Sequence, residues 1–163
     1  MLSVMEAPRW LSAQEQRAWR AYLAAHRLLI HQLDRELQAK GLSLSDYEIL
    51  VRLSESPGHR LRMSELADAT IQSRSKLSHQ ITRMEAAGLV TREGCEHDRR
   101  GTFAVLTQAG WETVQRVAPD HVASVRKHFI DQLTPEQIRT LEEAFTPIVD
   151  RLQAVRAHRC ARG

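Results

Sequence analysis

The 163-residue sequence is poor in the residues that build disulfide scaffolds and long irregular loops. It contains two cysteines, seven glycines and five prolines. Cys95 and Cys160 are too few for a disulfide scaffold, and neither has neighbours at metal-ligand spacing, so we expect two free thiols and no metal site. With so few glycines and prolines, long structureless segments have little room. The composition therefore predicts a folded, mainly helical chain.

Long apolar runs and catalytic signatures are also missing. No stretch approaches the roughly 20 apolar residues that a transmembrane helix needs. The N-terminal sequence MLSVMEAPRW lacks the basic-then-apolar layout of a signal peptide, so we expect a cytoplasmic protein with no membrane partner. The sequence contains no G-x-S-x-G elbow, glycine-rich phosphate loop or H-E-x-x-H motif, which argues against an enzyme and predicts no cofactor.

Two long helical patterns lie near the ends of the chain. Ser12 and Glu15 form a capping-box pattern that opens an amphipathic helix, and Gly41 is placed to end it. A second capping sequence, at 134–137, opens the last helix. Pro119 and Pro147 fall inside helical patterns, where we expect each to kink or break the helix.

The middle of the chain has a different organisation. Ser45 and Ser64 are predicted N-caps of two short helices, and Ser73 caps a third, whose buried stripe is Leu77, Ile81 and Met84. Two β-branched segments, 89–93 and 102–107, then flank a charged loop and predict a hairpin with a long tip. Two helices joined by a short turn and followed by a hairpin predict a winged helix-turn-helix.

The outward face of the Ser73 helix suits duplex DNA. No acidic residue lies between Ser73 and Arg83, although the net charge of the whole chain is only +3. Arginine can hold guanine with two hydrogen bonds, glutamine can do so for adenine, and serine suits phosphate or a base edge. A solvated helix face is the alternative interpretation. The residues predicted to be exposed for this purpose are Ser73, Arg74, Ser75, Lys76, Ser78, His79 and Gln80.

The hairpin tip carries a second candidate contact. Arg99 and Arg100 can reach a minor groove, whose narrow A·T-rich stretches have an enhanced negative potential. Asp98 would orient one guanidinium by pairing with it, which lowers the entropy lost when the other docks. The alternative is a solubilising loop with a surface ion pair worth about 0 to 1 kcal/mol.

Residues 63–110, MSELADATIQSRSKLSHQITRMEAAGLVTREGCEHDRRGTFAVLTQAG, resemble the MarR family of bacterial winged-helix repressors. D-R-R-G, followed by V-L-T-Q-A-G, is the most specific part of the resemblance. The resemblance implies an obligate homodimer whose terminal helices interlock and whose winged lobes each read half of a pseudo-palindrome. Asp98 and Arg100 match the wing pair of the family, and Arg83 joins the recognition-helix residues.

A single MarR-type domain over 1–163 is therefore expected. Its winged lobe spans 43–107, and dimerisation helices span 9–42 and 108–158. Independently of the resemblance, the end segments carry more apolar surface than one small lobe can cover, which favours a dimer with half-sites about 10 base pairs apart. The apolar residues concerned are Trp10, Trp19, Leu23, Phe129, Leu133, Phe145 and Ile148.

Many relatives bind small phenolic or carboxylate ligands between the dimer helices and the winged lobe. The resemblance implies a similar cleft here, and the candidate contacts are Trp19, Tyr22, His26 and Arg27, with His31 nearby. The expected function is that of a ligand-responsive, sequence-specific DNA-binding repressor. A winged-helix module that binds protein instead of DNA is the alternative, because a fold does not determine a function.

Overall fold

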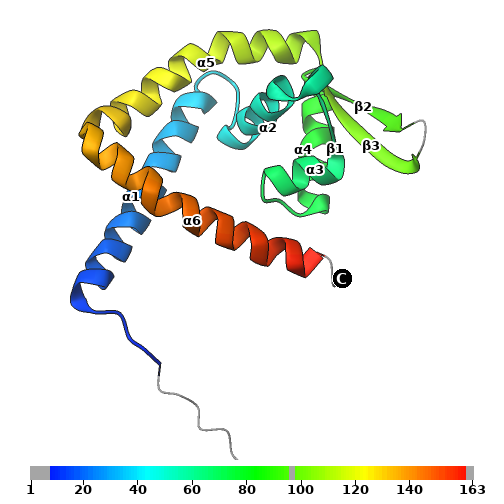
Figure 1. Cartoon of the computed structure of the whole chain (residues 1–163). Helices are drawn as coiled ribbons and strands as arrows, with labels where there is room; N and C mark the ends of the chain where they lie inside the picture. Colours follow the sequence, from blue (N-terminus) through cyan, green and yellow to red (C-terminus); the bar gives the residue numbers. More distant parts are fainter. Residues whose placement is uncertain (1–7, 96–97, 161–163) are drawn as a thin grey trace, which may run out of the picture. The chain divides into compact units, whose positions relative to one another are not determined.

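The computed structural model of the chain describes the backbone of residues 8–95 and 98–160, and the side chains of residues 8–94 and 101–156. The chain divides into two compact units, Met1–His121 and Val122–Gly163. The elements of the first unit are α1 (Ala13–Gln38), α2 (Leu44–Glu55), the 3-10 turn η1 (Pro57–His59), β1 (Arg60–Arg62), α3 (Met63–Ala69), α4 (Arg74–Ala86), β2 (Val90–Cys95) and β3 (Asp98–Leu106) (Figure 1). Helix α5 (Gln108–His128) continues into the second unit, which holds η2 (Ile130–Gln132) and α6 (Pro135–Cys160). The predicted fold class, mainly helical with a small β-hairpin wing, is confirmed.

The predicted cap of α1 is confirmed, but two predicted caps are wrong. The backbone N–H of Glu15 donates to Ser12 Oγ, and Glu15 accepts from the Ser12 N–H. Helix α2 begins two residues earlier than predicted, because Ser43 and not Ser45 accepts from the N–H of Asp46, at 3.1 Å. Ser64 lies inside α3, whose N-cap is Arg62. There the carboxylate of Glu65 accepts a hydrogen bond from the backbone N–H of Arg62 at 3.1 Å.

Helix α4 matches its prediction closely. Ser73 caps it by accepting from the N–H of Lys76 at 3.2 Å, and Leu77, Ile81 and Met84 are buried. Gly88 follows the C-cap with a φ of 73°, a conformation that costs glycine little. Helices α3 and α4 are in contact and are joined by a short turn, as a helix-turn-helix requires.

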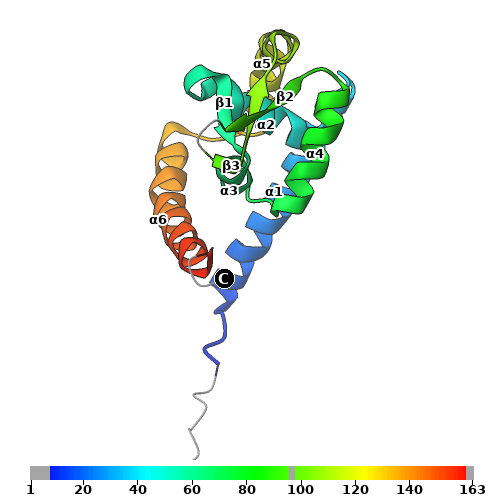
Figure 2. The ribbon, with the colours of Figure 1, turned by 90° about the vertical axis from the view of Figure 1, so that its right-hand side faces the viewer.

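The sheet has three antiparallel strands in the order β1-β3-β2. The hairpin arms are longer than predicted, because pairing continues past Gly94↔Thr102 to Cys95↔Asp98, with a register shift between Gly94 and Cys95. Backbone hydrogen bonds hold a ladder together, so a polar sequence does not end it. Figure 2 shows α4 beside this hairpin, and α4 contacts β2.

The hydrophobic core of the first unit lies between α2, the helix-turn-helix and the base of the hairpin. Its fully buried side chains are Ile49, Leu50, Leu53, Leu66, Leu77, Ile81, Val90 and Val117. Since Leu77 and Ile81 belong to α4, the same helix that presents a polar face outward is anchored inward by this core. The packing that stabilises the first unit therefore also fixes the orientation of α4.

Helices α5 and α6 run without interruption through Pro119 and Pro147. Neither proline breaks its helix, because one proline removes a single backbone hydrogen bond while the flanking turns keep theirs. The alternative, a kink at each proline, stays a prediction. Among the described residues, no helix is both long and apolar enough to span a bilayer.

Candidate nucleic-acid interface

The exposed face of α4 carries all but one of the residues predicted for it. Ser73, Arg74, Ser75, Lys76, Ser78, His79 and Arg83 are exposed. Arg83 keeps 70% of its side chain exposed while its Nη2 lies 3.5 Å from Oδ1 of Asp46, so this ion pair leaves the guanidinium accessible. The result is a hydroxyl-rich, cationic helix face of the width that a major groove accepts.

Gln80 is the exception, and its predicted exposure is wrong. Only 5% of the residue is exposed. Its Nε2 donates to Asp46 Oδ1 at 2.7 Å and to Ser45 Oγ at 3.0 Å, and its Oε1 accepts from Gln72 Nε2 at 3.0 Å. Position 80 falls three residues after Leu77 and four before Met84, which places it on the buried stripe. The helical spacing from Leu77 and Met84 therefore predicts that Gln80 is buried.

Arg92 on β2 is a functional candidate that the sequence did not single out. Its guanidinium lies on α4, where Nη2 donates to the carbonyl oxygen of Ser78 at 2.8 Å and to Thr82 Oγ1 at 3.1 Å. Nη1 forms an ion pair with Glu85. Strand periodicity alone does not indicate which helix an outward-facing arginine will contact.

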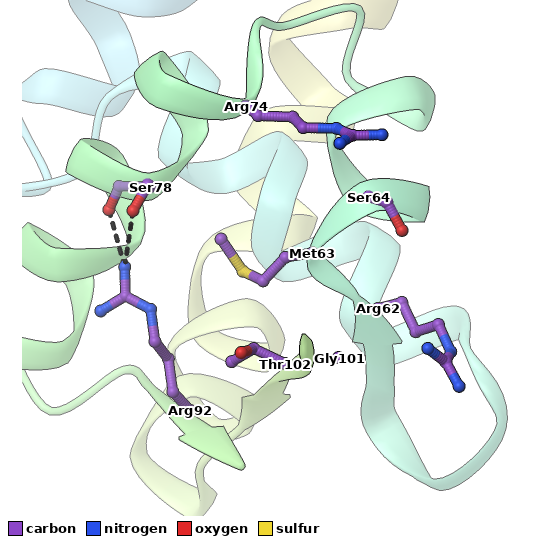
Figure 3. A pocket seen from close by; sticks show the side chains of 8 residues that line it. All are labelled: Arg62, Met63, Ser64, Arg74, Ser78, Arg92, Gly101 and Thr102. Carbon is purple, nitrogen blue, oxygen red and sulfur yellow. Dashed lines mark hydrogen bonds between the residues drawn. The ribbon is translucent and has the colours of Figure 1, made fainter. Parts of the chain in front are cut away.

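A groove of 410 Å³ opens between the start of α3, α4 and the hairpin (Figure 3). Arginine and hydroxyl side chains line most of it: Arg62, Ser64, Arg74, Ser78, Arg92 and Thr102, together with Met63 and Gly101. Within the described part of the chain, Arg74 makes no hydrogen bond or ion pair, so its five donors face the groove or solvent unpaired. Such a set of donors suits a phosphate group.

Arg60 extends the basic surface from Arg62 along β1, and both guanidiniums lie near the ring of Phe103. The guanidinium of Arg60 lies 4.0 Å from the centre of the Phe103 ring, and that of Arg62 lies 5.3 Å from it. Arg60 also pairs with Glu93 at 3.3 Å. Stacking on an aromatic ring restricts a long side chain without neutralising its charge.

The hairpin-tip residues Asp98, Arg99 and Arg100 form the first part of β3 by backbone. Their side chains lie outside the described ones. The orienting role predicted for Asp98 and the groove contacts predicted for the two arginines therefore stay predictions.

A second cleft, of 640 Å³, lies between α1 and the start of α2. His26 and Arg27 line it, as predicted, and His31 does too; the other lining residues are Ile30, Asp34, Leu44, Ser45 and Glu48. Trp19 and Tyr22 are not among them. Their rings instead form a row along α1, with Trp19 5.8 Å from Tyr22 and Tyr22 6.0 Å from His26.

No cluster of potential metal ligands occurs among the residues that the structure describes.

Comparison with known proteins gives consistent matches to one family. The sequence profile of the MarR family matches residues 40–101. AbsC, a MarR family transcriptional regulator from Streptomyces coelicolor, is 61% identical and superposes with a TM-score of 0.87 over 90% of this chain and 99% of that one. Sco3205, from the same organism and solved in complex with DNA, is 48% identical with a TM-score of 0.87, covering 91% of this chain and 93% of that one. PecS of Dickeya dadantii, an HTH-type transcriptional regulator, is 29% identical over 100 residues. The matched region is 61% of this chain and 60% of PecS.

Proposed function

The chain belongs to the MarR family of transcriptional regulators, and we propose that it binds duplex DNA as a homodimeric repressor, with α4 in the major groove. The observation that carries this proposal is the exposed face of α4, which has no acidic residue from Ser73 to Arg83, beside a groove lined by Arg74, whose donors have no partner among the described residues. The solved DNA complex of Sco3205 supports it. Its site of action is then the cytoplasm, where bacterial DNA lies.

Each part of this surface has a distinct role in the proposal. The side chains of Arg74, Lys76 and His79 face base edges and phosphates, and the hydroxyls of Ser73, Ser75 and Ser78 complete the phosphate contacts. Arg83 lies further along the same helix face. At the hairpin tip, Arg99 and Arg100 enter the adjoining minor groove, with Asp98 orienting one of them.

Exposed apolar side chains at both ends of the chain support the homodimer. In the first unit Trp10 is 84% exposed and Trp19 52%. In the second unit Ile148 is 51% exposed and Leu152 63%. Water-exposed apolar surface of this kind is typical of an interface. Two-fold symmetry would then present two copies of α4 to one pseudo-palindromic site.

DNA binding is tested by titrating genomic fragments selected for binding, with fluorescence anisotropy at several salt concentrations. We expect the logarithm of the affinity to fall linearly with the logarithm of salt concentration, with a slope of about −0.9 for each phosphate contacted. Arg74→Ala and Arg100→Ala should each weaken DNA binding and make the slope less negative. Arg151→Ala, which removes an exposed arginine from α6, is the matched control and should do neither. A flat salt response would favour the alternative, a winged-helix module that binds protein.

Sedimentation analysis tests the dimer. Ile148→Glu combined with Leu152→Glu places two charges on the exposed apolar part of α6 and should yield a monomer, whereas Arg151→Glu should remain a dimer. If the double variant dimerised at the same protein concentration as the wild type, the dimer interface would not include Ile148 and Leu152.

A small aromatic or carboxylate ligand in the cleft of α1 is the regulatory part of the proposal. Arg27, His26 and His31 supply cationic or donor groups there. Ser45 lines this cleft and accepts a hydrogen bond from Gln80 of α4. A ligand that contacts Ser45 would therefore affect the position of the recognition helix through this bond. Calorimetric titration with aromatic carboxylates, repeated on Arg27→Gln, tests the site. Equal affinities of the ligand for wild type and Arg27→Gln would mean that the ligand does not contact Arg27.

A further inference from the structure

Arg92 joins the first strand of the hairpin to two turns of the recognition helix. Its acceptors on α4 are Ser78, Thr82 and Glu85, which stand at i, i+4 and i+7 and therefore form one stripe along the helix. Figure 3 shows the guanidinium of Arg92 reaching from β2 to Ser78. One side chain thus contacts α4 over most of its length.

Both terminal nitrogens of Arg92 already have partners inside the protein. Nη2 has Ser78 and Thr82 as partners, and Nη1 has Glu85, whose carboxylate also balances the charge. The side chains of Arg92 and Glu85 are only 28% and 29% exposed, so water screens this ion pair less than an ordinary surface pair. Because Glu85 balances its charge, Arg92 attracts a DNA phosphate less strongly than an unpaired arginine does.

We propose that Arg92 and Glu85 form a positioning pair, which holds the hairpin at a set angle to α4 so that both elements meet the same duplex. The proposal rests on the DNA-binding function proposed above. Arg92 acts through α4 and the hairpin rather than through contact with DNA. Arginine suits this task because its planar fork serves several acceptors at once, which a lysine ammonium on a flexible stem does not.

Removal of Glu85 distinguishes positioning from electrostatics. Glu85 is an acid beside a surface proposed to bind phosphates, so its neutralisation should tighten DNA binding if only the electrostatic field matters. If Glu85 holds Arg92 in place, its neutralisation should weaken binding instead. The two interpretations therefore predict opposite changes in DNA affinity for the neutralisation of Glu85.

The experiment compares the duplex affinity of wild type with Glu85→Gln, Arg92→Gln, Arg92→Lys and the Glu85→Gln/Arg92→Gln double variant. We expect each variant to bind about tenfold more weakly, as the loss of a charge-assisted hydrogen bond implies. The double variant should be no weaker than Arg92→Gln alone, because both changes remove one interaction. Glu93→Gln is the matched control, since it removes an acid from the same strand whose partner is Arg60 and not α4.

Two further measurements separate positioning from a general loss of stability. Thr82→Val removes one acceptor without removing a charge and should weaken binding by a smaller factor while the protein stays folded by circular dichroism. Heteronuclear NOE values should fall at β2 amides in Glu85→Gln and stay unchanged in α2. Unchanged or tighter binding by folded Glu85→Gln, or losses that add in the double variant, would overturn the proposal. Failure of the wild type to bind any duplex would refute the proposed function instead.

Discussion

Nε2 of Gln80, buried on α4, donates a hydrogen bond to Oδ1 of Asp46 on α2 at 2.7 Å. The bond ties the recognition helix to α2 through two side chains that are 34 positions apart in sequence. Gln80→Leu fills a similar volume but leaves the half-buried carboxylate of Asp46 and the hydroxyl of Ser45 without this donor. We expect the free energy of unfolding to fall by about 1 to 3 kcal/mol, as measured by urea denaturation.

Ser75→Ala is the control for this experiment. Ser75 is exposed on the same helix, and its substitution should change stability by less than about 0.5 kcal/mol. Equal stability of Gln80→Leu and wild type would show that water replaces the amide at the α2 junction.

Gly110 lies where α5 begins, against the base of the hairpin. A Cβ at this position would overlap the backbone carbonyl oxygen of Leu89 and lie 2.7 Å from Cδ1 of Leu106. Since a backbone oxygen cannot move aside as a side chain can, we expect Gly110→Ala to lower the midpoint of thermal unfolding, at a cost of about 1 to 3 kcal/mol.

Gly94→Ala provides the comparison, because no atom of the described residues lies within 4 Å of a Cβ at Gly94. Its midpoint should stay close to that of the wild type. If Gly110→Ala unfolded at the same temperature as Gly94→Ala, α5 would have to be able to shift away from Leu89 at little cost.

The features that the sequence predicted well are those set by local rules. The cap at Ser73, the stop at Gly88 and the buried stripe of α4 depend on residues within a few positions of one another, and all three are confirmed. The same holds for the capping box of Ser12 and Glu15. Local hydrogen bonding and helical periodicity are sufficient to find such features.

The features that were missed depend on partners distant in sequence. Gln80 was expected outside because of its polarity, but Asp46 and Ser45, more than 30 positions earlier, satisfy it inside. The sequence predicts no role for Arg92, because nothing near it in the sequence indicates that its acceptors lie on α4. Polarity alone does not decide between the inside and the outside when tertiary packing supplies hydrogen-bond partners.

Ile71, in the turn between α3 and α4, has a φ of 54° and is 78% exposed. This left-handed conformation is costly for a β-branched residue, and the exposed side chain recovers little by packing. We expect Ile71→Gly to raise the free energy of unfolding by about 1 kcal/mol, measured by urea denaturation.

Two comparisons test the cause. Ile71→Val keeps the β-branch and should leave stability unchanged, whereas Gly88→Ala introduces a Cβ at a φ of 73° and should lower stability by about 1 kcal/mol. A loss of stability in Ile71→Gly would mean that the exposed isoleucine packs in solution against something that offsets the strain.

His121 on α5 makes the stability of the first unit depend on pH. Its ring centre lies 4.6 Å from that of Tyr47, and its Nδ1 is buried without a hydrogen-bond partner in the described structure. Burial lowers the pKa of His121 below its ordinary value of 6.5, and the nearby charge of Glu36 opposes the shift in part. The folded state therefore favours the neutral imidazole.

The direction of the pH effect follows from the depressed pKa. Between the folded pKa of His121 and 6.5, the unfolded chain binds more protons than the folded one, so the stabilisation present above pH 6.5 is lost as the pH falls through this window. Urea denaturation of wild type and His121→Phe between pH 8 and pH 5 measures this contribution as the difference between the two proteins, which cancels the other titrating groups. We expect wild type to lose stability relative to His121→Phe as the pH falls below 6.5. The opposite trend would mean that Glu36 stabilises the imidazolium by more than burial destabilises it.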